Sequence, residues 1–97
     1  MRISVRFFTT LRELTGRREE IIEYPDDEVA TISKVLQTLS RKYGGRFVGY
    51  VFDAKTSEAK GFLQFLVNGK SASILNGLQT ELKEDDVLAI LPPVGGG

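Results

Sequence analysis

A single stretch near the middle of the chain carries a long helical repeat of apolar residues. Its apolar positions recur at spacings of three, four and seven residues, which places them in one stripe along an α-helix. These positions are Ile32, Val35, Leu36, Leu39 and Tyr43. We expect Thr31 to cap the start of this helix and Gly44 with Gly45 to end it. A helix with one apolar stripe needs a covering layer, and the remaining segments predict a sheet.

Two strands are predicted before this helix. Ile3, Val5 and Phe7 alternate with polar residues, a period of two that is typical of a strand with one buried face. Residues 19–24 predict a second strand, which Pro25 ends. The two segments therefore predict a pair of strands joined by a wide connection.

The connection between these strands carries a helix signal. Thr10 and Glu13 lie three residues apart, which fits the capping box, in which the two side chains satisfy free backbone amides of a helical turn. We therefore expect a short helical turn there, followed by a reversal at Gly16.

The second half of the chain predicts further strands. Residues 47–52 are apolar and fit either a strand or a packed connection, whereas the polar residues 53–61 lack any period and predict a mobile loop. Residues 62–67 predict a strand. Asn68 with Gly69 then predicts a two-residue reversal with positive φ angles, leading into a short strand at residues 70–74.

The last predicted strand is an unbroken apolar run at residues 87–91, which Pro92 and Pro93 stop. One helix and about five strands predict an α+β fold in which a mixed sheet covers one main helix. The unbroken run suits a central strand beside the first strand of the chain. With 97 residues in all, we expect one folded domain at residues 1–91 and a flexible tail at residues 92–97.

The charge balance argues against two classes of partner. Lysine plus arginine and aspartate plus glutamate number 13 each, so the chain has no net positive field for nucleic acid or for an anionic membrane. Polar residues also interrupt the apolar character of residues 1–8, which disfavours a signal peptide or a membrane span. We expect a soluble, cytoplasmic protein that binds neither nucleic acid nor membrane.

Cysteine and histidine are both missing from the sequence. Thiol catalysis, the commonest zinc sites and disulfides are therefore excluded. The acidic residues 26–28 lie before the main helix, and Arg41 and Lys42 lie at its end, the order that complements a helix dipole. Asp85 and Asp86 suit a polar turn. We expect no metal site.

The end of the sequence combines a stiff section with a flexible one. It reads Pro92, Pro93, Val94, Gly95, Gly96, Gly97. Proline favours extended backbone, whereas glycine lacks a Cβ and restricts nothing. Such a tail can enter a narrow tunnel and bring a carboxylate close to a phosphate. The alternative interpretation is a frayed terminus with no function.

Three segments together resemble one family. They are residues 7–14 (FFTTLREL), residues 67–69 (VNG) and residues 85–97 (DDVLAILPPVGGG). In this order they resemble the ubiquitin-like sulfur carriers of the MoaD/ThiS type, most of all the small subunit of molybdopterin synthase. The resemblance implies a β-grasp fold. The chain departs from the pattern at residues 53–61, which are longer than in compact members, and at Gly95, where many members have Ala or Ser.

The resemblance also implies a function without catalytic side chains. An E1-like adenylating enzyme uses ATP to adenylate the carboxylate of Gly97, and a sulfur donor converts the adenylate to a thiocarboxylate. The protein then donates sulfur beside the large subunit of molybdopterin synthase, in molybdenum or tungsten cofactor biosynthesis. It binds no cofactor permanently, and Gly95, Gly96 and Gly97 thread into the partner.

The same resemblance implies which residues contact partners. Phe8 and Leu91 help to contact the large subunit, together with Pro92, Pro93 and Val94. The alternative for Phe8 and Leu91 is ordinary core, although one of two adjacent phenylalanines must face inward and Phe7 fits that role better. Arg12 and Glu13 fit either a polar partner contact or a solvated helical turn.

Two other functions remain open at this point. The same activated carboxylate of Gly97 suits a ubiquitin-like modifier that is conjugated to lysines. A plain binding module with an inert tail is the third possibility.

Overall fold

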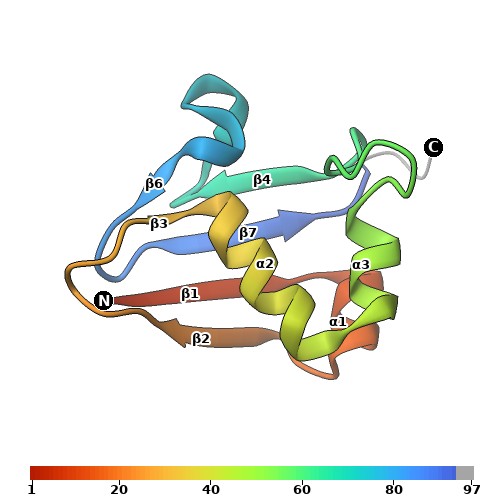
Figure 1. The fold of residues 1–97 in the computed structure, drawn as a ribbon, viewed down its shortest axis with the longest axis horizontal. Coiled ribbons are helices and arrows are strands. Elements are labelled where there is room, and N and C mark those ends of the chain that lie inside the picture. The colour runs from red at the N-terminus through yellow and green to blue at the C-terminus, as the bar shows by residue number, and fades with distance from the viewer. Residues whose placement is uncertain (94–97) are drawn as a thin grey trace.

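The computed structural model describes residues 1–93. Five strands form one sheet in the order β2-β1-β7-β4-β5 (Figure 1). Their bounds are Glu19–Glu23 for β2, Arg2–Phe7 for β1, Val87–Leu91 for β7, Gln64–Val67 for β4 and Lys70–Ser71 for β5. The predicted α+β architecture with a mixed sheet of five strands is confirmed.

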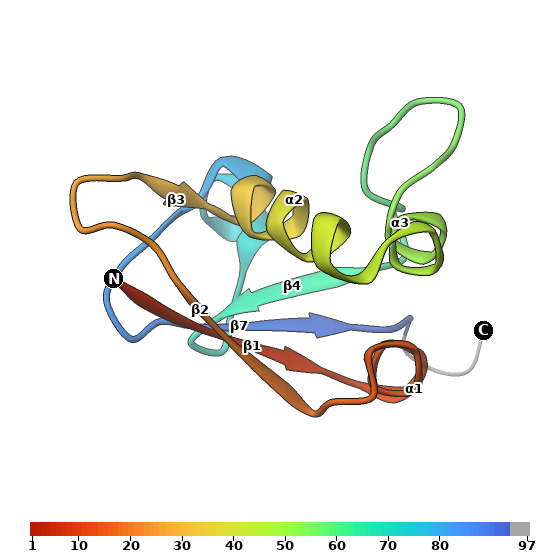
Figure 2. The same cartoon turned by 60° about the horizontal axis from the view of Figure 1, so that its bottom comes forward.

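The main helix α2, Ile32–Tyr43, crosses one face of this sheet (Figures 1 and 2). Thr31 caps it as predicted, because its Oγ1 accepts a hydrogen bond of 3.1 Å from the Lys34 amide. Gly44 ends it with a φ of 77°, a conformation that glycine adopts without strain. The fully buried side chains facing each other across the interface are Ile3, Val5, Phe7, Ile32, Val35, Leu36, Leu39, Leu88 and Ile90.

Strand β7 occupies the centre of the sheet, as its unbroken apolar run predicted. It runs parallel to β1, with Phe7 opposite Ile90. On its other side it runs antiparallel to β4, with Gln64 opposite Leu91. The strand is therefore hydrogen-bonded on both edges, and its last residues share one end of the sheet with the last residues of β1.

Helix α1, Thr9–Thr15, confirms the predicted helical turn but not its predicted cap. The helix begins one residue before Thr10, its N-cap is Phe8, and no side chain caps it. Thr10 therefore lies inside the helix, where its hydroxyl cannot reach the first free amides. The helix ends as expected at Gly16, whose φ is 73°.

Helix α3, Gly45–Val51, replaces the strand or packed connection predicted at residues 47–52. Phe47 and Val51, four residues apart, are both fully buried. The Phe47 ring lies 6.2 Å from the Tyr43 ring at the end of α2. Burial of this helical face accounts for the helix, because two glycines in seven residues give it little intrinsic propensity.

The polar segment after α3 is organised by local hydrogen bonds. The Asp53 carboxylate accepts from the amides of Lys55 and Thr56 at 2.8 and 3.2 Å. An isolated antiparallel bridge joins Phe52 to Ala59. The segment is a loop, as predicted, and its base is closed by backbone pairing.

The reversal at Asn68 and Gly69 is confirmed, with φ angles of 50° and 85°. The strand after it is shorter than predicted, because the chain turns into a 3-10 helix, η1, at Ala72–Ile74. A second 3-10 helix, η2, follows at Gly77–Gln79. A separate two-stranded pairing of β3, Ala30–Thr31, with β6, Glu81–Leu82, was not predicted. Within residues 1–93, no helix has the length and apolarity needed to cross a bilayer.

The different positions of Thr31 and Thr10 predict different costs for the same substitution. Thr31→Ala removes a capping hydrogen bond and should lower the free energy of unfolding by about 1 kcal/mol. Thr10→Ala removes an exposed hydroxyl inside a helix and should change it by less than about 0.5 kcal/mol. Urea unfolding of both variants measures the difference. Equal losses would contradict the observed start of α1.

Candidate functional site at the end of the central strand

The tail leaves the folded body at the end of β7. Pro92 is half-buried and Pro93 is exposed. Because β1 and β7 are parallel and Phe7 pairs with Ile90, the residues that follow each strand emerge at the same end of the sheet. The start of α1 and the first residues of the tail therefore lie at the same end of the sheet, as Figures 1 and 2 show.

Phe8 and Leu91 are the two body residues predicted to contact a partner, and the structure brings them to this end of the sheet. Phe7 is fully buried, whereas Phe8 and Leu91 are half-buried and lie outside the main core cluster. Their ordinary-core alternative is therefore weakened. The Arg12 guanidinium lies 5.9 Å from the centre of the Phe8 ring, so the side chain of Phe8 has a cation over one face.

Val94, Gly95, Gly96 and Gly97 lie outside the described residues. Their predicted roles in threading and in forming the thiocarboxylate stay predictions. The described part of the site is the base of the tail and the body surface around it. One larger hollow of the surface lies between α2, α3 and the segment after α3, and another lies between that segment, β4 and the 3-10 helices. Neither contains any of the described residues predicted for the site.

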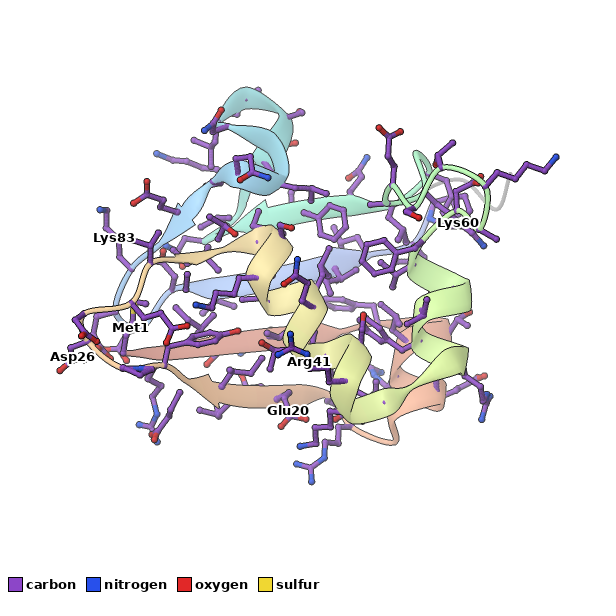
Figure 3. All side chains as sticks on the ribbon, in the orientation of Figure 1. Met1, Glu20, Asp26, Arg41, Lys60 and Lys83 are labelled. Carbon is purple, nitrogen blue, oxygen red and sulfur yellow. The ribbon has the colours of Figure 1, made fainter. Side chains whose placement is uncertain are left out.

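The acidic residues before α2 have a different role from the predicted one. None of them lies in the first turn of the helix. The Asp26 carboxylate instead accepts a hydrogen bond of 2.8 Å from the amino group of Met1 (Figure 3). This contact raises the pKa of the Met1 amino group and lowers the pKa of Asp26. The N-terminal strand is thereby tied down at the end of the sheet opposite the tail.

The polar turn at Asp85 and Asp86 is confirmed. Asp85 has a φ of 65°, and the Asp86 carboxylate accepts from the Lys83 amide and the Asn68 side chain, each at 2.8 Å. These bonds join the turn before β7 to the turn after β4. Among residues 1–93 there is no group of three carboxylates arranged to hold a metal ion.

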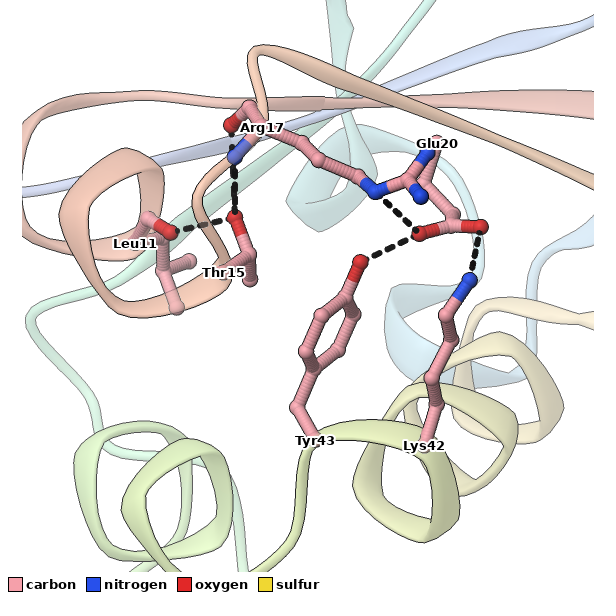
Figure 4. Close-up of polar contacts among 6 residues, drawn as sticks. All are labelled: Leu11, Thr15, Arg17, Glu20, Lys42 and Tyr43. Atoms are coloured by element: carbon pink, nitrogen blue, oxygen red, sulfur yellow. Dashed lines mark hydrogen bonds and ion pairs between the residues drawn. The ribbon is translucent and has the colours of Figure 1, made fainter.

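A buried carboxylate that sequence reasoning missed lies near the other edge of the sheet. Glu20 is only 7% exposed, and Figure 4 shows Lys42, Tyr43 and Arg17 converging on it. The Lys42 ammonium donates at 2.7 Å, and the Tyr43 hydroxyl donates a short hydrogen bond to the other carboxylate oxygen. The Arg17 Nε lies 3.9 Å from that second oxygen. Strand β2 is thus fastened to the end of α2.

The charge state of this cluster follows from its contacts. Burial raises the pKa of Glu20, but hydrogen bonds from Lys42 and Tyr43, with the positive charges of Lys42 and Arg17, outweigh burial and leave the pKa below its ordinary value of 4.5. Burial and the bond to Glu20 raise the pKa of Tyr43 to about 12. The cluster therefore holds an ionised carboxylate and a neutral phenol, and it has no group poised for proton transfer near neutral pH.

The Tyr43 ring links this cluster to the candidate site. It packs edge-on against Phe7 with ring centres 6.1 Å apart. Phe7 directly precedes Phe8, so the cluster helps to fix the end of β1. We conclude that Glu20, through Tyr43, helps to hold the end of β1 from which Phe8 follows.

The comparisons with known proteins agree with this geometry. The model of the ThiS family matches residues 5–97 of the chain. The chain belongs to this family of ubiquitin-like sulfur carriers, related to MoaD. It is 34% identical over 97 residues to small archaeal modifier protein 3 of Haloferax volcanii, with 100% of both chains covered.

Solved structures of relatives confirm the ThiS-family fold. The chain matches the crystal structure of SAMP1 from Haloferax volcanii with a TM-score of 0.83, 27% identity and 100% coverage of both chains. It matches the putative molybdopterin converting factor, subunit 1, from Pyrococcus furiosus with a TM-score of 0.73 and 26% identity, covering 97% of this chain and 99% of that one. The predicted β-grasp fold is therefore confirmed.

The Glu20 cluster predicts a pH-dependent loss of stability. Glu20→Gln should lower the free energy of unfolding by about 1.5 to 3 kcal/mol near neutral pH, the usual contribution of hydrogen bonds to a charged group. Because folding lowers the pKa of Glu20, its stabilisation is present above the unfolded value of about 4.5 and fades as pH falls through the folded value. Urea unfolding of both proteins between pH 7 and pH 3 measures this effect, because their free energies of unfolding should become more similar as pH falls.

Glu19→Gln is the matched control for this measurement. Glu19 is adjacent in the strand but exposed, and its oxygen lies 3.6 Å from the Arg6 Nε. We expect the control to cost less than about 1 kcal/mol. A loss for Glu20→Gln that is as large at pH 3 as at pH 7 would show that the ionised carboxylate is not its source.

Proposed function

We propose that this protein is a covalent sulfur carrier whose reactive group is the α-carboxylate of Gly97. An E1-like adenylating enzyme activates this carboxylate with ATP, and a sulfur donor converts it to a thiocarboxylate. The protein then donates sulfur as the small subunit of molybdopterin synthase. The observation that carries the proposal is the position of Pro93, which is exposed two residues after the end of the central strand of a ThiS-family fold.

The chemistry needs only a free carboxylate. An α-carboxyl group has a reference pKa of about 3.5, so near neutral pH it is an anion that attacks the α-phosphate of ATP and releases pyrophosphate. Sulfide then attacks the acyl carbon of the adenylate and breaks its bond to AMP. The products are AMP and a thiocarboxylate, so atoms balance without an oxidant or a reductant.

The protein itself supplies no catalyst for these steps. It has no cysteine and no histidine, and the one buried carboxylate in the described part of the chain, Glu20, is engaged by Lys42 and Tyr43. The partner enzymes must therefore supply the base, the metal and the nucleophile. This division of labour suits a carrier.

Recognition by partners must come mainly from the folded body. Residues 92–97 span at most about 20 Å at roughly 3.3 Å each. Ordering three glycines costs about 3 to 6 kcal/mol of backbone entropy, so the tail anchors poorly. The half-buried side chains of Phe8 and Leu91 at the base of the tail supply the apolar contact that the tail lacks.

Two observations support the specific role in pterin chemistry. The segment FFTTLREL ends β1 and builds α1 at the base of the tail. The similarity to the Pyrococcus furiosus protein also extends over nearly the whole of both chains.

Conjugation to lysines is the second candidate function. The full-length similarity to small archaeal modifier protein 3 favours it. The same adenylated Gly97 would transfer its acyl group to a lysine amine instead of to sulfide, and AMP would leave in both cases.

Thiocarboxylation is directly measurable on the purified chain. Incubation with the adenylating enzyme, ATP and sulfide should shift the intact mass by one oxygen-for-sulfur exchange. A variant lacking Gly97 should not shift, because its carboxylate stops about 3.3 Å short. An unchanged mass for the full chain would contradict the carrier proposal.

The pterin role has its own readout in the same system. Adding the large synthase subunit and the pterin precursor to the thiocarboxylated chain should return the mass to its starting value. Retention of sulfur by the chain would contradict donation to a pterin and would leave the carrier proposal standing.

A ladder of conjugates separates the second candidate from the first. Cells that express a tagged chain should show higher-mass species on denaturing gels if Gly97 is joined to lysines, and deletion of Gly97 should abolish them. Absence of the ladder from cells with the full tagged chain would remove this candidate.

A further inference from the structure

A shallow hollow lies on the body next to Phe8. Its lining comes from β1, the start of α1 and the segment that leads into β2. The lining residues are Arg6, Phe7, Phe8, Arg12, Arg18 and Glu19. We call this set the arginine hollow. It gathers three cations and one carboxylate on a chain whose overall formal charge is zero.

The positive charge of the arginine hollow is only partly neutralised. Glu19 pairs with Arg6, with 3.6 Å between the nearest nitrogen and oxygen. Within residues 1–93, no carboxylate oxygen lies within 4.0 Å of the guanidinium of Arg12 or Arg18. Two of the three cations in the hollow therefore lack an anionic partner in the described part of the chain.

Arg12 also carries an unsatisfied donor. Its Nε is buried and has no hydrogen-bond partner among the described residues. A buried donor without an acceptor costs free energy, so the Arg12 side chain is not fully satisfied by the chain's own groups. The position of the guanidinium over the Phe8 ring holds the fork in place.

The surroundings of the arginine hollow indicate what kind of occupant fits. A guanidinium fork binds a carboxylate through two parallel hydrogen bonds. Arginine beside a half-buried aromatic ring is a composition that protein interfaces favour at their centres. Nucleic acid fits poorly, because the charge is local and the chain as a whole is neutral.

The location of the hollow indicates which partner reaches it. Phe7 pairs with Ile90 across the parallel strands, so Phe8 and α1 lie at the same end of the sheet as the base of the tail. A protein that binds residues 92–97 therefore approaches the end of the sheet that carries the arginine hollow. The protein that binds the tail is therefore also the one that supplies an anionic group to the arginine hollow.

We propose that the arginine hollow docks an acidic segment of the adenylating enzyme, with an Asp or Glu carboxylate on the Arg12 and Arg18 guanidinium groups. This inference rests on the proposed function, because it names the contact by which the activating partner recognises the body. The carboxylate binds the guanidinium groups in the hollow, and the pair is desolvated when the partner closes over Phe8. Arg12 and Arg18 are docking residues and take no part in the chemistry.

The test is a steady-state assay of ATP–pyrophosphate exchange by the adenylating enzyme, with the full chain as the varied substrate. The double variant Arg12→Glu/Arg18→Glu should raise KM about tenfold or more, because like charges then face each other. Its kcat should stay within about twofold, since the tail and its carboxylate are unaltered. Raising the salt concentration should raise the KM of the unaltered chain more than that of the variant.

The matched control is Lys70→Glu/Lys83→Glu, which changes the net charge equally. Both lysines are exposed at the opposite end of the sheet: Lys70 begins β5 directly after the turn at Asn68 and Gly69, and Lys83 lies in the turn before β7. The control should keep the KM of the unaltered chain within about twofold. Equal KM values for the two double variants would overturn the docking site and leave the proposed function standing.

Two further measurements distinguish a loss of docking from a loss of folding. Arg12→Lys with Arg18→Lys keeps the charge and loses the fork, so its KM should lie between those of the unaltered chain and the glutamate variant. The Tm of every variant is measured in parallel. A KM that rises in proportion to the loss of Tm across the variants would overturn the inference. No exchange with the unaltered chain would contradict the proposed function, and the docking site with it.

Discussion

The parallel pairing of β1 with β7 is the constraint on which the rest of this structure depends. It places the last strand of the chain in the middle of the sheet, between β1 and β4. Leu88 and Ile90 are fully buried beneath α2, and burial of each contributes about 1.5 to 3 kcal/mol. The backbone that leads into the tail is therefore paired on both edges as far as Ile90 and on the β4 edge as far as Leu91, and α2 covers one of its faces.

In the proposed function, this arrangement separates the folded body from the reactive carboxylate of Gly97. The body contributes apolar and charged surface at the base of the tail, through Phe8, Leu91 and the arginine hollow. The tail contributes only reach and a carboxylate. In the proposed function, specificity lies in the docking of the body, and the partners supply the thiol and imidazole groups that the sequence lacks.

The elements that could be predicted were those with a strong local pattern. The stripe of α2, the alternation of β1 and the unbroken run of β7 each have one dominant period, and packing agrees with it. The short apolar run that forms α3 has no such period, so only the burial of Phe47 and Val51 decides it. The predicted cap of α1 was wrong because Thr10 lies two residues after the observed N-cap, Phe8.

The buried Glu20 illustrates a different limit. Ile22 and Tyr24 face the core, so a strict period of two also turns Glu20 inward and could have indicated it. Charged residues are rarely buried without partners, and the partners of Glu20 are 22 and 23 residues away at the end of α2. Which residues of distant segments meet is information that local patterns do not contain. Arg12 could be named from the sequence as a candidate partner contact, but its grouping with Arg6 and Arg18 in the arginine hollow could not.

The central claim is that the carboxylate of Gly97 is the functional group of this protein. Appending one bulky residue after Gly97 moves the carboxylate and leaves the body unchanged. We expect this variant to keep its Tm and to lose both adenylation and sulfur uptake in the presence of the adenylating enzyme, ATP and sulfide. Adenylation and sulfur uptake at the rate of the unaltered chain would contradict the claim.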